Sequence, residues 1–416
     1  MSSHRPRVVR SSVKEFMMDS SEGPKTVKGF LAEIKDTSEL MVDLAYAAIF
    51  FSDADLAKEV RRLEDRMVEH LRGLRRLSIL AARSPEDAEH MAGVLEIAAA
   101  VEKIADAAED IAGIVASGIG ILEDLRRDLR HAEEVVARVK VREDAEAVGQ
   151  SLRDLALPVE IGMWIIAARR GGEWNFDPGR DFTVSGGDVL LVRGPEDGIN
   201  LARKVMGAPE LPEQPDPPEI VLSDLDRAVD LIVEMKDSSE VAVGLAYSAL
   251  LFNSPALATE VANLEARSDA IHDELESWVL RSAQEARNPD DLRGLIRLAQ
   301  ASEMIFDSAR EMTRLVEAGE ELHPVIAAAL VESDEFGHET VVQPGAPADG
   351  RTIKVLQIET ETGMFVLAVQ RGRRWTYRPK PRFTFQAGDR VIAVGPAEGG
   401  EELDDLAGLQ REFQDV

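Results

Sequence analysis

The chain has 416 residues, a formal net charge of −29 at pH 7 and no cysteine. The length is enough for about two to four domains, and the lack of cysteine excludes disulfides, thiolate nucleophiles and zinc–thiolate sites. The negative charge repels nucleic acid phosphates, so nucleic acid is not an expected partner. An acidic excess in which arginine outnumbers lysine favours a halophilic source, where salt screens the repulsion.

The N-terminal segment, residues 1–24, is basic and then polar, without the hydrophobic core of a secretory signal. No apolar run in the chain reaches the roughly 18 residues that a membrane-spanning helix needs. We therefore expect a flexible tail at 1–24 and a chain that stays in the cytoplasm, at the membrane only through a transporter.

Residues 25–133 carry a helical pattern. Apolar side chains recur every three or four residues in three stretches, 31–48, 56–74 and 91–115. This spacing predicts three long amphipathic helices. Asp53 can cap the second helix, and Ser84 followed by Pro85 can start the third. Long helices joined by short turns pack antiparallel, so we expect a three-helix bundle, with a shorter helix near 122–136.

The pattern changes period in residues 134–208. Short β-branched runs between glycine turns predict four strands, at 139–141, 163–168, 182–184 and 189–192. Helical patterns occupy 151–155 and 195–206. The sequence therefore predicts a small α+β domain, and residues 209–218, with five prolines, predict an extended linker after it.

The chain is an internal duplication. Residues 35–66 recur at 236–267 with an offset of 201 and without a gap, and 17 of the 32 positions are identical. We therefore expect a second bundle at 219–334, whose third helix starts near 288–290, a second α+β domain at 335–409, and a tail at 410–416. The expected fold class is α+β multidomain, with two three-helix bundles alternating with two small α+β domains.

Several carboxylates of the bundles are kept in both copies. Glu102, Asp106 and Asp110 lie four residues apart on one helical face, and the second copy keeps this column as Glu303, Asp307 and Glu311. Three further acids are retained in the second copy, as the pairs Glu64 and Glu265, Asp36 and Asp237, Glu39 and Glu240. Nearby positions have diverged, as in the pairs Asp43 and Gly244, Arg61 and Ala262, Asp65 and Ala266. Selective retention indicates a role beyond solubility.

The bundles resemble the PhoU family of helical regulators of phosphate uptake. The resemblance is carried by Glu-x-x-x-Asp motifs at 102–106 and 303–307 and by Leu-Glu-x-Arg at 63–66 and 264–267. It implies binding of a divalent or ferric metal ion through carboxylates. The candidate ligands are Glu64, Glu102, Asp106, Asp110, Glu265, Asp269, Glu303, Asp307 and Glu311. Val68 stands where Glu64 would need an acidic partner, and a solvated acidic face is the alternative interpretation.

The α+β domains resemble the TrkA-C domain, also called RCK-C, a regulatory module of potassium channels and cation transporters. The resemblance is carried by Arg-Gly at 170–171 and 371–372 and by Gly-Asp at 187–188 and 388–389. It implies binding of cyclic di-AMP or another nucleotide, with Arg170 and Arg371 as candidate phosphate ligands. An ordinary turn arginine in a surface ion pair is the alternative.

No catalytic pattern is found. The glycine fingerprint of a Rossmann nucleotide-binding domain is missing, because Gly118-Ile119-Gly120 lies at a helix end and lacks the third glycine. None of the seven histidines is spaced for a triad or a zinc site. We therefore do not expect an enzyme.

Together the resemblances imply an archaeal-type protein that regulates a membrane cation transporter or channel, for potassium or a divalent cation, through a small ligand or cation. The alternatives are a phosphate-signalling adaptor whose TrkA-C domains only pair, and a metal buffer. Like domains are expected to pair, either within one chain as a pseudo-symmetric monomer or between chains as a homodimer.

Overall fold

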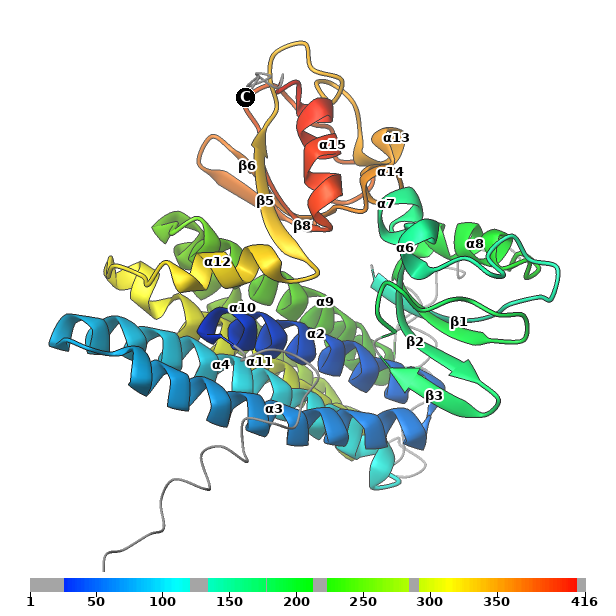
Figure 1. Cartoon of the computed structure of the whole chain (residues 1–416), viewed down its shortest axis with the longest axis horizontal. Helices are drawn as coiled ribbons and strands as arrows, with labels where there is room; N and C mark the ends of the chain where they lie inside the picture. Colours follow the sequence, from blue (N-terminus) through cyan, green and yellow to red (C-terminus); the bar gives the residue numbers. More distant parts are fainter. Residues whose placement is uncertain (1–25, 120–133, 177, 212–222, 284–291, 410–416) are drawn as a thin grey trace, which may run out of the picture.

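A computed structural model describes residues 26–119, 134–176, 178–211, 223–283 and 292–409 (Figure 1). Several expected segments lie outside this part of the chain: the tails at 1–24 and 410–416, most of the linker at 209–218, most of the helix near 122–136, and the helix start at 288–290.

The first bundle has the three helices that the sequence predicts. They are α2 (Val27–Phe51), α3 (Ala54–Ala81) and α4 (Pro85–Ala116). The Asp53 carboxylate accepts hydrogen bonds from the backbone N–H groups of Asp55 and Leu56, at 2.9 and 3.3 Å, and so caps α3. Ser84 caps α4 by accepting from the Asp87 N–H at 3.0 Å, directly before Pro85. Both expected caps are confirmed.

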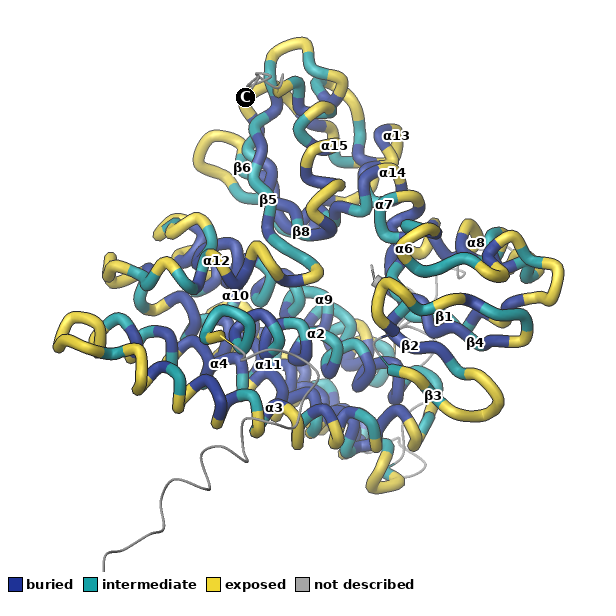
Figure 2. Tube along the Cα trace, in the orientation of Figure 1, coloured by how far each residue is buried: buried dark blue, intermediate teal, exposed yellow. Residues whose placement is uncertain are grey.

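The second bundle repeats this arrangement, and the two bundles share one core. Its helices are α9 (Asp224–Leu251), α10 (Pro255–Ser282), α11 (Leu292–Ala318) and the short α12 (Val325–Glu332). Helix α4 of the first bundle packs against α11 of the second, and buried apolar side chains of both bundles form a single hydrophobic cluster. Figure 2 shows the inner faces of the long helices buried and their outer faces exposed.

Each α+β domain is built on a four-stranded antiparallel sheet with its own small core. The first sheet has the order β1-β4-β2-β3, formed by β1 (Glu134–Lys140), β4 (Val189–Pro195), β2 (Trp164–Arg170) and β3 (Glu173–Phe176). The second has the order β5-β8-β6-β7, formed by β5 (Phe336–Val341), β8 (Arg390–Gly395), β6 (Phe365–Arg371) and β7 (Arg374–Tyr377). The helices of these domains are α6 (Leu152–Leu155), α7 (Leu157–Ile161), α8 (Glu196–Val205), α13 (Ile353–Leu356), α14 (Ile358–Thr362) and α15 (Ala397–Ala407).

Two details of the expected sheet were wrong. Residues 182–184 form no ladder strand, because the segment makes only an isolated bridge between Ser151 and Thr183. The sheet has β3 in place of this segment. The pairing of β3 with β2 through the turn at Gly171-Gly172 was not predicted. The one-turn helix α7 and its counterpart α14 were also missed. The fold class itself is confirmed, with two helical regions alternating with two small sheets (Figure 1).

The two α+β domains contact each other through α7 and α14. Two glycines related by the offset of 201 make this approach possible. A Cβ on Gly162 would lie 2.2 Å from the carbonyl oxygen of Glu359, and one on Gly363 would lie 2.0 Å from that of Pro158. The contact is therefore reciprocal, and like domains pair within one chain.

In the part of the chain that the structure describes, no helix is both long and apolar enough to cross a bilayer.

Candidate functional site

The predicted acidic column of the first bundle lies between α3 and α4. Burial raises the pKa of Asp106, and the neighbouring carboxylates Glu102, Glu109 and Asp110 raise it further. Burial likewise raises the pKa of Glu64 on α3, with further contributions from acids of α3 and α4. Glu102 accepts a hydrogen bond from the Arg75 guanidinium at 2.9 Å. The carboxylates therefore converge, although one already has a cationic partner.

The second bundle places its column in the same way. Burial raises the pKa of Asp307, followed by the charges of Glu265, Asp269 and Glu311. Glu265 accepts from Arg310 at 2.6 Å, and Glu303 pairs with His272. Glu311 accepts from Lys103 of the first bundle, also at 2.6 Å. Three of the expected ligands in this bundle are thus held in ion pairs.

The arrangement of these acids decides whether they can form a metal centre. Within the described residues, no group of three or more carboxylates or histidines is placed to hold a metal ion. Arginine, lysine and histidine side chains occupy the space next to Glu102, Glu265, Glu303 and Glu311. As they stand, the nine residues do not supply a ligand set, so metal binding through them stays a prediction and no chemical step is assigned to a metal here.

Arg170 and Arg371 end β2 and β6 and make matching contacts. Arg170 donates from Nε and Nη2 to the two carboxylate oxygens of Asp188, at 2.8 and 2.7 Å, and from Nη2 to the Thr183 carbonyl at 2.8 Å. Arg371 does the same with Asp389, at 2.7 and 2.6 Å, and with the Thr384 carbonyl.

The two aspartates of these pairs are almost fully buried, 1% and 0% exposed, and the Arg170 guanidinium lowers the pKa of Asp188 although burial opposes it. Each arginine therefore fixes the Gly-Asp turn of its domain. Binding of a nucleotide phosphate by the same guanidinium groups stays a prediction.

The acids retained on the first helices belong to a buried network that crosses between the two halves. Lys35 is 3% exposed and donates to Glu39 at 2.6 Å, while its Nζ lies 5.1 Å from the ring centroid of Tyr247. Lys236 is 5% exposed, lies 2.9 Å from Glu240, and is 5.8 Å from the ring of Tyr46. Each lysine thus contacts a tyrosine of the other half by a cation–π interaction.

Burial lowers the pKa of Lys35, but the carboxylates of Glu39 and Asp36 outweigh it, so the pKa is raised and the ammonium stays charged. Burial raises the pKa of both tyrosines, which stay neutral. Lys35 and the two tyrosines therefore keep fixed protonation states between the halves of the molecule.

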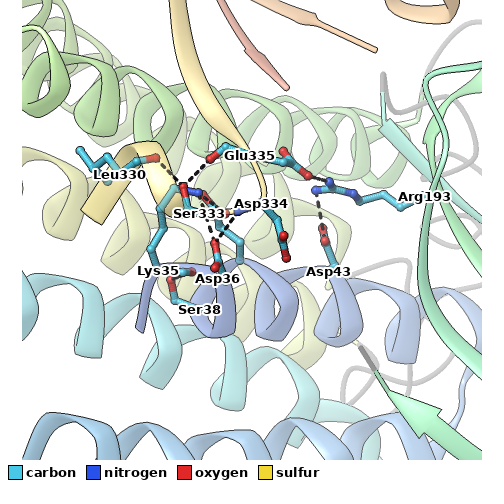
Figure 3. Close-up of polar contacts among 10 residues, drawn as sticks. Lys35, Asp36, Ser38, Asp43, Arg193, Leu330, Ser333, Asp334 and Glu335 are labelled. Carbon is cyan, nitrogen blue, oxygen red and sulfur yellow. Dashed lines mark hydrogen bonds and ion pairs between the residues drawn. The ribbon is translucent and has the colours of Figure 1, made fainter. Parts of the chain in front are cut away.

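A cavity of about 450 Å³ opens beside this network, where α2, the first α+β domain and the segment before β5 meet. Six carboxylate residues and two arginines line it: Glu33, Asp36, Glu39, Asp43, Asp334, Glu335, Arg66 and Arg193. His70 and Trp164 also contribute to its wall. In Figure 3, Asp36 of α2 points toward Asp334, and Arg193 extends from the first sheet between Asp43 and Glu335. Its volume is in the range of small-molecule sites.

Asp36 is a strongly perturbed acid of this cavity. Burial raises its pKa to about 8; Lys35 opposes the shift, and the charges of Glu39 and Asp334 add to it. Its Oδ1 accepts a hydrogen bond from the Asp334 backbone N–H at 3.4 Å and lies 3.9 Å from the Lys35 ammonium. A carboxyl group with such a pKa in a cavity is a candidate binding group.

Asp36 and Glu39 stand out in the sequence as acids retained in both copies, whereas Arg193, Trp164 and Glu335 of this cavity were not predicted. Arg193 pairs with Asp43 at 3.1 Å and with Glu335. A comparison of the two copies contained the necessary information. The counterpart of Asp43 is Gly244 and that of Arg193 is Val394, so both partners of the ion pair were lost or gained together. The change at position 43 is therefore coupled to the change at position 193 and is not an independent divergence.

Comparisons with known proteins agree with this domain order. The PhoU domain model matches residues 31–115 and 232–316, and the TrkA-C domain model matches residues 136–207 and 338–408. A search of curated proteins gave no significant match.

Solved structures with similarity include PhoU from Pseudomonas aeruginosa, at 15% identity and a TM-score of 0.38, covering 70% of this chain and 93% of that one. The GsuK RCK domain is 14% identical with a TM-score of 0.18, and 67% of this chain and 64% of that chain are covered. The GsuK channel, also 14% identical with a TM-score of 0.18, is matched over 68% of this chain and 54% of its own. The protein therefore belongs to the PhoU and TrkA-C domain families and carries each domain twice, in alternation.

Proposed function

We propose that this protein is a cytoplasmic regulator of a membrane cation transporter or channel, for potassium or a divalent cation. It responds to a small ligand or cation and has no catalytic role of its own. Both of its domain families are regulatory, and the solved structures with similarity to this chain include the GsuK RCK domain and the GsuK channel.

The observation that supports this proposal best is the position of the acidic cavity. Its wall comes from α2 of the first PhoU domain, from Trp164 to Ile166 and Arg193 of the first TrkA-C domain, and from Asp334 and Glu335 of the second half. A ligand in this cavity contacts three parts of the molecule at once. It therefore stabilises one arrangement of the TrkA-C domain on the bundle over others, which is the requirement for a ligand-driven population shift.

A test of this proposal compares cells of the source organism with and without the gene. We expect loss of the protein to change the uptake rate of radioactive rubidium, a potassium analogue, or of a divalent cation, and to leave uptake of radiolabelled phosphate unchanged. Re-expression of the intact chain is the control and should restore the rate. Unchanged uptake of all the cations would contradict the proposal.

A phosphate-signalling adaptor is the second candidate, because the PhoU model matches both bundles and the TrkA-C domains contact each other through α7 and α14. In that case the TrkA-C pair has only a structural role. The same uptake experiment separates the two candidates, since an adaptor changes phosphate uptake and leaves the cations unaffected. A metal buffer, the third alternative, has no arranged ligand set among the described residues.

A further inference from the structure

In the second half of the chain, the residues equivalent to the cavity residues bind a guanidinium group. Arg378 directly follows β7, and its guanidinium group is directed at α9. Nη1 lies 3.2 Å from Asp237 and Nη2 lies 3.4 Å from Glu240. Its Cζ lies 5.0 Å from the ring centroid of Phe365. The side chain is 8% exposed. A guanidinium is thus held between two carboxylates and an aromatic ring.

The backbone at Arg378 supports the view that this contact is specific. Its φ angle is +40°, in the left-handed region that a long side chain adopts only at a cost. The ion pairs with Asp237 and Glu240 offset that cost. The second half therefore holds a guanidinium at this position despite the left-handed backbone.

The first half keeps the receptor for this group. The offset of 201 relates Asp237 to Asp36, Glu240 to Glu39, and Phe365 to Trp164, and all three first-half residues line the acidic cavity. Tryptophan is the strongest cation–π partner among the aromatic residues, so the exchange of phenylalanine for tryptophan strengthens the site. The position equivalent to Arg378 is residue 177, which is an aspartate and lies outside the described residues. The sequence therefore supplies no arginine at that position.

The two arginines in the wall do not replace Arg378. Arg193 is paired with Asp43 and Glu335, an arrangement that has no counterpart at Gly244 and Val394. Arg66 is retained in the second half as Arg267, which pairs with Glu234 and coexists there with Arg378. Lys35 has an equivalent in Lys236, which also coexists with Arg378. The first half thus has the cations that the second half has, apart from the guanidinium of Arg378.

We propose that the cavity beside Asp36 binds a small organic cation that ends in a guanidinium group, with this group between Asp36 and Glu39 and over the ring of Trp164. The planar guanidinium presents its N–H donors to carboxylate oxygens in a fork geometry. A spherical ion, such as potassium or a divalent metal ion, has no such geometry. The cavity of about 450 Å³ is larger than the head group and leaves room for the rest of a small metabolite.

This inference deepens the proposed function and rests on it for the consequence of binding. In the second half, Arg378 links the TrkA-C sheet to α9 by ion pairs, and this link is permanent because the arginine is part of the chain. In the first half, the ligand makes the equivalent connection between the first TrkA-C domain and α2 only when it is present. The ligand therefore completes the pseudo-symmetry of the molecule, and its concentration sets how firmly the first TrkA-C domain is docked.

The test is calorimetric titration of the full-length chain, in one fixed salt concentration and at a pH above the pKa of Asp36. The probes are methylguanidine and L-arginine. L-Citrulline, which has a neutral urea group in place of the guanidinium, and potassium chloride are the controls. We expect one binding site per chain for both guanidinium compounds and no binding of citrulline. No heat with either guanidinium compound, or equal binding of citrulline, would overturn the inference.

Two variants assign the site. Asp36→Asn should weaken binding about tenfold or more, because it removes a charged hydrogen-bond acceptor, and Trp164→Leu should weaken it about threefold to thirtyfold through loss of the cation–π contact. Asp144→Asn, which changes an exposed acid of the first TrkA-C domain outside the cavity wall, is the matched control and should bind normally. Asp36→Asn replaces a carboxyl group that is already largely protonated at neutral pH, so this variant should fold, as circular dichroism can check. Undiminished binding by Asp36→Asn would also overturn the inference.

The failures of the two proposals are distinguishable. If the calorimetry fails while the gene deletion still changes cation uptake, the inference is wrong and the proposed function stands. If the guanidinium compounds bind as expected while cation uptake does not depend on the gene, the ligand site is real and the proposed function is wrong.

Discussion

Removal of Arg378 should strongly destabilise the folded chain. Arg378→Ala leaves Asp237 and Glu240 with one cation fewer in a nearly closed environment, so we expect a loss of about 3–5 kcal/mol in the free energy of unfolding. Urea denaturation measures it. Millimolar methylguanidine should restore part of the lost stability by entering the vacated space.

Arg153→Ala is the control for this experiment. Its ion pair with Asp181 spans 2.9 Å, but the two side chains are 64% and 89% exposed. An exposed pair of this kind contributes about 0–1 kcal/mol. A loss at Arg378 no larger than the loss at Arg153 would contradict the importance that we give to the buried guanidinium.

Asp36 predicts a pH dependence of stability. Its pKa is about 8 in the folded chain and about 4 in an unfolded chain. The folded state therefore binds a proton more tightly than the unfolded state, so the contribution of Asp36 to stability is complete below the unfolded pKa and decreases as the pH rises through 8. Charged and titratable groups that face it are Lys35, Glu33, Glu39, Asp43, Arg66, His70, Arg193, Asp334 and Glu335.

Asp36→Asn should remove this part of the pH dependence. Between pH 6 and pH 9 the wild type should lose on the order of 1–2 kcal/mol more than the variant, a figure kept low because the side chain is about one-third exposed. Urea denaturation of both proteins at the two pH values measures the difference. Parallel behaviour of the two proteins would show that the carboxyl group titrates normally.

At the scale of elements, the contact between α7 and α14 depends on Gly162 and Gly363. We expect Gly363→Ala to destabilise the chain and to increase hydrogen exchange in both helices, because its Cβ would lie 2.0 Å from the Pro158 carbonyl oxygen. Gly372→Ala is the matched control. Gly372 has a similar φ of +62° and no heavy atom within 4 Å of an added Cβ, so it reports the backbone cost alone, about 1–2 kcal/mol. Equal losses for the two variants would mean that the interface is not tightly packed.

Helices were easier to predict from the sequence than strands. A helix such as α3 has apolar residues at a regular spacing and a side-chain cap at Asp53, and both are local features. The strand β3 has four residues, and its identity depends on pairing with β2, which is decided by neighbours in space. The segment at 182–184 has the composition of a strand, but its backbone bonds to residues 150–152 instead.

The candidate site was only partly predictable for the same reason. Asp36 and Glu39 were recognised because both copies keep them. The cavity itself is formed by residues separated by about 300 positions, such as Asp36 and Asp334, and no periodicity in the sequence places them together. The acids of α4 were recognised by spacing, yet spacing does not reveal the ion pairs of Glu102 and Glu311.

For the whole molecule, the pairing of like domains inside one chain predicts a monomer. The PhoU domains share a core, and the TrkA-C domains meet through α7 and α14. Light scattering after size-exclusion chromatography should give a mass near 45.6 kDa. A mass of twice this value at low protein concentration would favour exchange of domains between two chains.

The net charge predicts how the whole molecule responds to salt. A charge of −29 destabilises the compact state by self-repulsion, and molar salt reduces the screening length to about 3 Å. We expect the melting temperature to rise between low and molar potassium chloride. Sodium chloride is the comparison, since screening alone should give the same rise with both salts. A melting temperature that does not increase with either salt would contradict a halophilic adaptation.

The crossed contacts of Lys35 with Tyr247 and of Lys236 with Tyr46 make each half incomplete without the other. Once each ammonium group had come to depend on an aromatic ring encoded by the other gene copy, a split of the gene at the proline-rich segment would produce two incomplete products. The two halves therefore depend on each other for these contacts although they differ at the guanidinium position, where one has its own arginine and the other an exchangeable occupant.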